Sequence, residues 1–308
     1  MRTLLKSRNL LLLLFILLIP ASSFAQIAVS IRIGPPALPV YTQPPCPADG
    51  YLWTPGYWAY GPVGYYWVPG VWVMPPRAGV LWTPGYWGFE GGFYGWHAGY
   101  WGPRIGFYGG INYGFGYGGV GFFGGRWAGE RFVYNTAVVN VNTTVVRNVY
   151  VDRTVINNTT VVNNHASFNG AGGVMARPTS QEQMAEHENH VQPTSMQMSH
   201  EHAASQDHSQ LASENHGHPG TMAMDSVNGR RFNQQGRIAN GVASGQLTAG
   251  ETRHLEARQQ NINHQVAADR QANGGKLTGQ ERKNINHQQN VASKKIYQDK
   301  HNEKTAPR

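Results

Sequence analysis

The sequence predicts a mixed, segmented fold: a small antiparallel β meander of aromatic repeats, a low-complexity and disordered middle, and a C-terminal helical hairpin repeat. Three observations predict it. Tryptophans recur regularly within residues 50–104, large apolar residues become rare over residues 165–229, and a 30-residue period runs through residues 230–300. Because the chain holds 38 glycines and its composition shifts from segment to segment, we expect separate segments and no single large core.

The N-terminus has the pattern of a secretory signal peptide, predicted over residues 1–25. Arg2, Lys6 and Arg8 precede an apolar run over residues 10–19, and small residues lead up to Ala25. The run is too short to cross a bilayer, so we expect cleavage, export to the periplasm or to the outer membrane or cell surface, and no transmembrane segment in the mature chain. Residues 26–49 are predicted to be a Pro-rich linker, in which Cys46 has no partner cysteine.

Residues 50–104 contain four copies of a Trp-x-x-Gly-x-Trp unit, whose first tryptophans are 14, 15 and 14 residues apart. The tryptophans of the units are Trp53, Trp58, Trp67, Trp72, Trp82, Trp87, Trp96 and Trp101. A unit of this length suits one strand and one tight turn. The Gly- and Pro-rich segments 61–64, 75–79 and 90–92 predict where the turns lie.

The interior of each unit interrupts a regular strand. Three units carry Pro-Gly and the fourth carries Ala-Gly, so a bulge or bend is expected between the two tryptophans. These tryptophans are five positions apart and would face opposite sides of an unbroken strand, whereas a one-residue bulge would return them to one face. We expect the rings mainly to pack on one another in an aromatic ladder, and an exposed glycan-binding platform is the alternative.

The four units resemble the WxxGxW (YXWGXW) repeat proteins of bacterial envelopes, and the resemblance covers roughly residues 50–102. It implies an exported protein of unknown function and transfers no catalytic residue. Some of the proteins with these repeats are surface lipoproteins, but this chain lacks the lipid-attachment cysteine, which counts against an anchored role.

Two further segments follow the units. Residues 105–131 are Gly/aromatic low-complexity sequence, which predicts a poor core former and a candidate for self-association. Residues 132–164 are rich in Val, Asn and Thr, and NTTVV occurs at 142–146 and again at 158–162. This composition predicts strands whose register is weakly specified, because polar and apolar residues do not alternate cleanly.

The predicted disordered linker, residues 165–229, interleaves histidine with methionine. Thioether and imidazole ligands suit Cu(I) and Ag(I), so metal binding is one interpretation and a polar linker is the other. No closed four-ligand set for zinc is fixed by the spacing. The candidate ligands are Met184, His187, Met196, Met198, His200, His202, His216, His218, Met222 and Met224.

Residues 230–300 predict helices near 231–243, 249–272 and 279–298. Thr248 with Glu251 and Thr278 with Glu281 have capping-box spacing, and Gly-containing pairs end the helices that precede them. The apolar stripe is thin, so we expect a weakly packed hairpin that docks on something else. The spacing of the loop residues resembles an EF-hand, but we reject this interpretation because the loops lack the oxygen ligands that calcium needs. Residues 301–308 are predicted to be a disordered tail.

Charge and motif content narrow the function. Residues 26–176 carry 7 basic against 4 acidic residues (+3), residues 177–228 carry 1 against 7 (−6), and residues 229–308 carry 14 against 6 (+8). An envelope protein or an anionic envelope polymer is the expected partner, and nucleic acid is not expected for an exported chain. With no nucleophile, HExxH or phosphate-loop motif, the sequence predicts a non-enzymatic structural or interaction protein without a cofactor. Periplasmic Cu(I)/Ag(I) binding and glycan binding are the alternatives.

Overall fold

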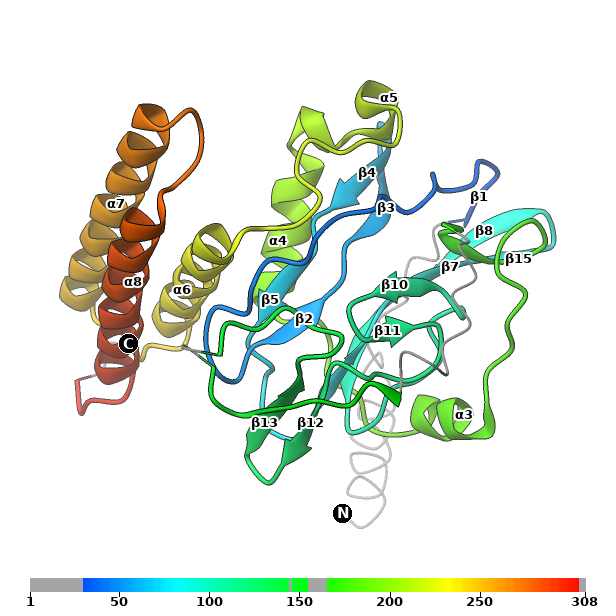
Figure 1. The fold of residues 1–308 in the computed structure, drawn as a ribbon, viewed down its shortest axis with the longest axis horizontal. Helices are drawn as coiled ribbons and strands as arrows, with labels where there is room; N and C mark the ends of the chain where they lie inside the picture. Colours follow the sequence, from blue (N-terminus) through cyan, green and yellow to red (C-terminus); the bar gives the residue numbers. More distant parts are fainter. Residues whose placement is uncertain (1–29, 144–145, 155–164, 305–308) are drawn as a thin grey trace, which may run out of the picture.

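The computed structural model describes residues 30–143, 146–154 and 165–304. A β-rich region comes first, short helices cover one side of it, and long helices stand beside it at the C-terminal end (Figure 1). The predicted signal peptide, the second NTTVV copy and residues 305–308 lie outside the described residues.

The aromatic units pair in twos to form long, interrupted hairpins. In the first, β2 (Leu52–Thr54) pairs antiparallel with β5 (Val71–Val73), and β3 (Tyr57–Gly61) pairs with β4 (Gly64–Val68). The second repeats this: β6 (Leu81–Thr83) pairs with β9 (Tyr100–Gly102), and β7 (Tyr86–Glu90) with β8 (Phe93–His97). The tight turns lie within 61–64 and 90–92 as predicted, whereas segment 75–79 links the hairpins without pairing β5 to β6. The predicted continuous meander is therefore wrong.

Shorter strands extend this core. β1 (Ser30–Ile31) and β15 (Phe168–Gly170) flank the β7–β8 hairpin in the sheet order β1-β8-β7-β15, where β15 runs parallel to β7. A small hairpin joins β10 (Asn112–Gly114) to β11 (Tyr117–Gly118). The remaining sheet has the order β12-β13-β14, and its strands are β12 (Gly125–Ala128), β13 (Arg131–Asn135) and β14 (Val149–Tyr150).

The segments on either side of the units belong to the core. Tyr108, Tyr113 and Tyr117 are buried in the same apolar cluster as Trp53, which corrects the expectation that residues 105–131 are a poor core former. Tyrosine hydroxyls make this burial feasible by donating to free backbone carbonyls, such as Tyr113 to Gly85 at 2.7 Å. In the described part of the predicted linker, residues 30–49, the carbonyls of Ala37 and Pro44 accept from the Nε1 atoms of Trp58 and Trp72, so this part packs against the hairpins.

The prediction of disorder over residues 165–229 is wrong for the part that the structure describes. This segment contains strand β15 and short helices, and Thr179 and Thr194 begin two of the helices with capping boxes. Long-range contacts to the hairpins hold the helices in place, which composition alone does not reveal. The helices are α3 (Ser180–Glu186), α4 (Ser195–Ser205), the 3₁₀ helix η1 (His208–Gln210) and α5 (Ala212–Asn215).

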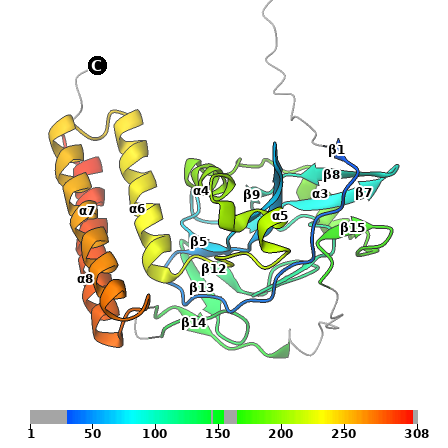
Figure 2. The same ribbon diagram turned by 90° about the horizontal axis from the view of Figure 1, so that it is seen from above.

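The C-terminal helices are α6 (Ser226–Ala243), α7 (Ala249–Ala272) and α8 (Gly279–Lys300). The three stand side by side in Figure 2, and α6 contacts both others, so they form a bundle where a hairpin was expected. Thr248 and Thr278 each accept a hydrogen bond from the backbone N–H of the glutamate three residues later, and the glutamate side chains accept from the threonine N–H groups. These reciprocal bonds explain where α7 and α8 begin.

Buried amides run through the bundle interior. Gln259 Nε2 donates to Gln234 Oε1 at 3.0 Å, and Gln234 Nε2 donates to the Gln289 carbonyl at 2.6 Å. Small apolar clusters lie on both sides of these amides, one around Ile262 and Ile285. Because buried polar groups need partners, the amide chain fixes how the helices align.

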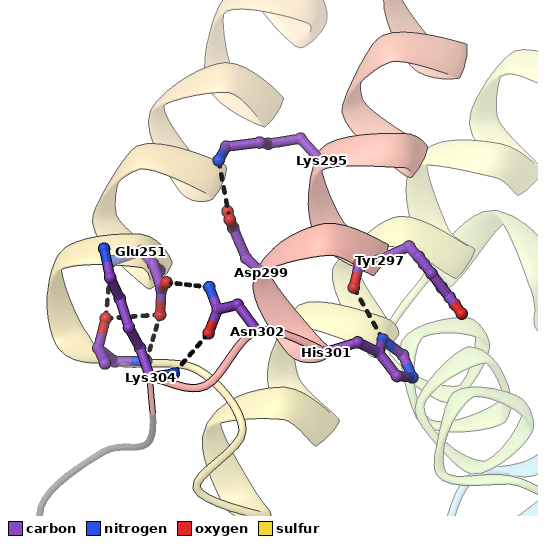
Figure 3. A network of polar contacts seen from close by, with 8 residues as sticks. Glu251, Lys295, Tyr297, Asp299, His301, Asn302 and Lys304 are labelled. Atoms are coloured by element: carbon purple, nitrogen blue, oxygen red, sulfur yellow. Dashed lines mark hydrogen bonds and ion pairs between the residues drawn. The ribbon is translucent and has the colours of Figure 1, made fainter.

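The bundle docks on the β region of its own chain. Asn233 Nδ2 on α6 donates to the Trp72 carbonyl at 2.8 Å, and Met196 on α4 lies against Gly236 on α6. The residues after α8 also fold back: Asn302 donates to Glu251 at 2.8 Å (Figure 3), which corrects the predicted disorder for residues 301–304. No helix of the described residues is long and apolar enough to cross a membrane.

Candidate functional site

The tryptophans of the units meet across the hairpins. Each first tryptophan of one unit lies opposite the second tryptophan of its partner, so Trp53 faces Trp72 and Trp58 faces Trp67. The ring centroids of these pairs are 5.4 and 5.3 Å apart. The second hairpin repeats the arrangement at 5.3 Å for Trp82 with Trp101 and 5.2 Å for Trp87 with Trp96.

The glycine of each unit receives the first tryptophan ring of the partner unit. A Cβ atom on Gly70 would lie 2.5 Å from Cζ2 of Trp53, and one on Gly56 would strike Trp67. The second hairpin has the same reciprocal arrangement. A Cβ atom on Gly85 would lie 2.5 Å from Cζ2 of Trp96, and one on Gly99 would lie 2.6 Å from Cζ2 of Trp82. Any side chain at these glycines would collide with a ring, so the motif needs glycine for space.

The tryptophan pairs of one hairpin join different apolar clusters. Trp53 and Trp72 belong to the largest cluster, whereas Trp58 and Trp67 belong to another one together with Trp87. The expected interruption between the two tryptophans of a unit is present, because β2 ends at Thr54 and β3 begins at Tyr57. It does not return both rings to one face, as a one-residue bulge would have done. Seven of the eight rings are buried and Trp96 is half-buried, so these rings do not form an exposed platform.

The breaks in both hairpins meet at a cavity of about 80 Å³, which α4 covers. Figure 1 shows α4 lying beside β4. Half-exposed Tyr57 and Trp96 and exposed Ala98 are part of its wall, so the cavity opens to solvent. The lining residues are Thr54, Pro55, Tyr57, Val68, Pro69, Val71, Trp82, Pro84, Gly85, Trp96, Ala98, Gly99, Tyr113, Pro193, Gln197, His200 and Glu201.

Polar contacts bind α4 to this cavity. The Tyr57 hydroxyl donates to Glu201 at 2.9 Å, and Nε1 of Trp101 donates to Gln197 at 2.8 Å. The His200 ring donates from Nε2 to the Pro69 carbonyl at 2.7 Å, since that oxygen can only accept. Burial lowers the pKa of His200, which keeps the ring neutral. Burial and the nearby Glu201 carboxylate raise the pKa of Tyr57, so its hydroxyl remains a donor.

Helix α4 was not predicted from the sequence as part of this site, although a capping-box spacing indicates where the helix begins. Thr194 and Gln197 have the same capping spacing that predicted the C-terminal helices, and both sides of that capping box form. Gln197 then serves twice, because its Oε1 accepts from the backbone N–H of Thr194 as well as from Trp101.

The predicted metal ligands lie on different elements of the structure and do not form one site. Met196 and His200 are buried and packed or hydrogen-bonded elsewhere, whereas Met184, His187, Met198 and His202 are exposed on α3 and α4 or at their ends. Met224 packs partly buried against the largest cluster. Among the described residues, no three His, Cys, Asp or Glu side chains are grouped so that they could hold a metal ion.

One subset of the metal candidates does share a surface. His216, His218 and Met222 line an open groove together with His165 and residues 36–40. His216 and His218 are exposed and Met222 is half-buried. These side chains therefore share one groove, although the three histidines that line it are not grouped closely enough to form a metal site by themselves.

Comparison with known proteins agrees with the repeat geometry. The family model described as WXXGXW repeat matches residues 49–73 in two copies, which is the first hairpin. The second hairpin lies outside the matched residues but shows the same register and glycine contacts. No curated protein and no solved structure matches the chain. Residues 49–73 are thus a pair of WXXGXW repeats, folded as one interrupted hairpin.

Proposed function

We propose that this chain is a non-enzymatic structural and interaction protein of the bacterial cell envelope, exported to the periplasm or to the outer membrane or cell surface. The WXXGXW match at residues 49–73 and the signal-peptide pattern support this proposal. The buried aromatic hairpins serve as the scaffold, and the helical bundle beside them presents the contact surface.

The charge distribution of the bundle carries the proposal. Several of its acidic groups are occupied internally: Asp225 pairs with Arg270 at 2.6 Å, Asp299 pairs with Lys295 at 2.8 Å, and Glu251 serves as a cap. By contrast, the exposed cations Arg253, Arg258, Lys283 and Lys294 form no ion pair with a described residue. An anionic envelope polymer is the partner that this excess of positive charge fits.

Binding to a defined polyanion tests the proposed surface. The full mature chain, residues 26–308, is titrated with dextran sulfate, and neutral dextran of equal length serves as the reference. The test variant carries Arg258→Gln, Lys283→Gln and Lys294→Gln. The control variant removes three exposed arginines of the β region, as Arg32→Gln, Arg77→Gln and Arg131→Gln.

The two variants lead to different expectations. If each bundle cation contributes about 1 kcal/mol at low salt, the triple variant loses roughly a hundredfold in affinity, whereas the control stays near wild type. Salt weakens wild-type binding because it screens exposed charges. Equal losses in both variants would show that only net charge matters and would reject the bundle as the contact surface.

Export needs a separate test. The full chain is expressed in a bacterial host, the cells are fractionated, and the intact mass of the protein is measured. Cleavage before Gln26 and recovery outside the cytoplasm are expected. Full-length protein retained in the cytoplasm would reject the envelope assignment while leaving the repeat structure untouched.

A second candidate function, binding of Cu(I) or Ag(I), is favoured by the groove that His216, His218 and Met222 share. The variant His216→Asn, His218→Asn, Met222→Leu removes the soft ligands, and asparagine tolerates the left-handed φ of 52° at residue 216. The control His202→Asn, Met198→Leu removes exposed ligands on α4. Ag(I) uptake should disappear only in the first variant, and equal uptake by both would dismiss the groove as a metal site.

A further inference from the structure

The cavity between the repeat hairpins has a distinct charge character. Glu201 is half-buried in its wall, and no Lys or Arg is among the described residues that line it. His200, a basic residue in the same wall, donates its Nε2 proton to the Pro69 carbonyl. The carboxylate therefore receives hydroxyl donors, from Tyr57 at 2.9 Å and Tyr66 at 3.5 Å, but has no cation within the cavity.

Four aromatic side chains also line the cavity. Tyr57, Trp82, Trp96 and Tyr113 all line the cavity, and the rings of Tyr57 and Trp96 are stacked with centroids 5.2 Å apart. The faces of such rings carry partial negative charge and attract cations, above all cations that are weakly hydrated. A carboxylate beside several aromatic rings is thus complementary to an organic cation and unfavourable for an anion.

We propose that this cavity binds a small alkylammonium ion, held by the Glu201 carboxylate and by the aromatic rings of both repeat hairpins. The cavity volume of about 80 Å³ exceeds what a single water needs and admits a ligand of a few non-hydrogen atoms. Because α4 covers the cavity, the ligand is a free small ion and not a group on a large surface. This site is opposite in charge to the bundle surface and independent of it.

Binding would also link parts of the molecule that are distant in sequence. Glu201 belongs to α4, Tyr57 to the first hairpin and Trp96 to the second. A ligand that contacts these three elements stabilises the folded state by mass action, since the unfolded chain offers no such cavity. Thermal unfolding of the full chain should therefore shift upward as the ligand saturates the site.

The experiment uses tetramethylammonium as the probe and the full mature chain as the protein. Calorimetric titration and tryptophan fluorescence should both show saturable binding, because Trp82 and Trp96 lie in the wall. Neopentyl alcohol, similar in shape but uncharged, should bind at least about tenfold more weakly. No saturable binding of tetramethylammonium, or equal binding of the uncharged analogue, overturns the proposal.

A matched pair of variants locates the site. Glu201→Gln keeps the shape of the side chain and removes the charge, and it should weaken tetramethylammonium binding at least about tenfold. Glu214→Gln on α5 removes an exposed carboxylate and should leave binding unchanged. Circular dichroism checks that both variants fold. If Glu201→Gln does not fold, the comparison of tetramethylammonium with neopentyl alcohol on the wild-type chain still tests whether the cavity selects a cation. Unchanged affinity in a folded Glu201→Gln variant overturns the proposal.

Discussion

Replacing Gly70 with alanine tests why the repeat contains glycine. The new Cβ would lie 2.5 Å from Cζ2 and 2.9 Å from Cη2 of Trp53, and 3.0 Å from the Gly56 nitrogen. Neither side can yield easily. The Trp53 ring is 1% exposed and packs against Trp72, and the Gly70 backbone is held by hydrogen bonds to residues 222 and 224. Overpacking of a well-packed core costs about 1–3 kcal/mol, and we expect Gly70→Ala at the upper end of that range.

Gly95→Ala is the matched control. Gly95 lies in β8 of the second hairpin, and a Cβ there meets nothing within 4 Å. The control should change the free energy of unfolding by less than about 0.5 kcal/mol. Urea unfolding followed by tryptophan fluorescence measures both variants. Equal stability of the two would refute the steric reading of the motif.

A double variant sharpens the same test. Trp53→Phe shortens the ring that Gly70 receives, so it should partly accommodate the alanine. The cost of the double variant should then fall short of the sum of the single costs by about 0.5–3 kcal/mol, as expected for residues in contact. Strict additivity would mean that the ring and the glycine do not constrain each other.

Three further predictions concern the bundle. Thr248→Ala and Thr278→Ala each remove a capping hydroxyl and should cost about 1 kcal/mol in urea unfolding followed by circular dichroism, whereas no loss would dismiss the caps as stabilising. Hydrogen bonds from the Thr248 hydroxyl and from Asn302 lower the pKa of Glu251 from 4.5 to about 2. The ionised Glu251 therefore stabilises the fold fully above pH 4.5, and this contribution is lost as the pH falls toward 2. The free energy of unfolding of Glu251→Gln should accordingly depend less on pH in this range than that of the wild type. Asn233→Ala leaves the buried Trp72 carbonyl without its donor and should cost about 1–3 kcal/mol, with the bundle unfolding before the tryptophan signal changes.

Local chemistry explains which parts of the fold could be predicted. The turns within 61–64 and 90–92 follow from Gly and Pro at fixed positions, and the starts of α7 and α8 follow from the Thr-x-x-Glu spacing. Each of these signals involves residues within a few positions of one another. These turns and helix starts could therefore be predicted from neighbouring residues alone.

Long-range contacts explain what could not be predicted. Trp53 pairs with Trp72 and not with a tryptophan of the third unit, and nothing in four similar units distinguishes these pairings. The helix α4 could not be predicted from composition for a similar reason. The segment around it contains few large apolar residues, and this composition indicates disorder. What holds α4 is a set of polar contacts to distant residues, such as His200 to Pro69, and these are invisible until the hairpins exist.

The reciprocal contacts imply that a single unit is an incomplete structure. Trp53 needs the glycine of the second unit, and Trp67 needs Gly56 of the first, so neither ring has its receiving surface until both units are present. The second tryptophan of each unit likewise packs on the first tryptophan of the partner unit across the hairpin, as Trp72 does on Trp53 and Trp58 on Trp67. The folding unit of this repeat is therefore the pair. Two copies matched over residues 49–73, and the same arrangement again over residues 81–102, are what that requirement produces.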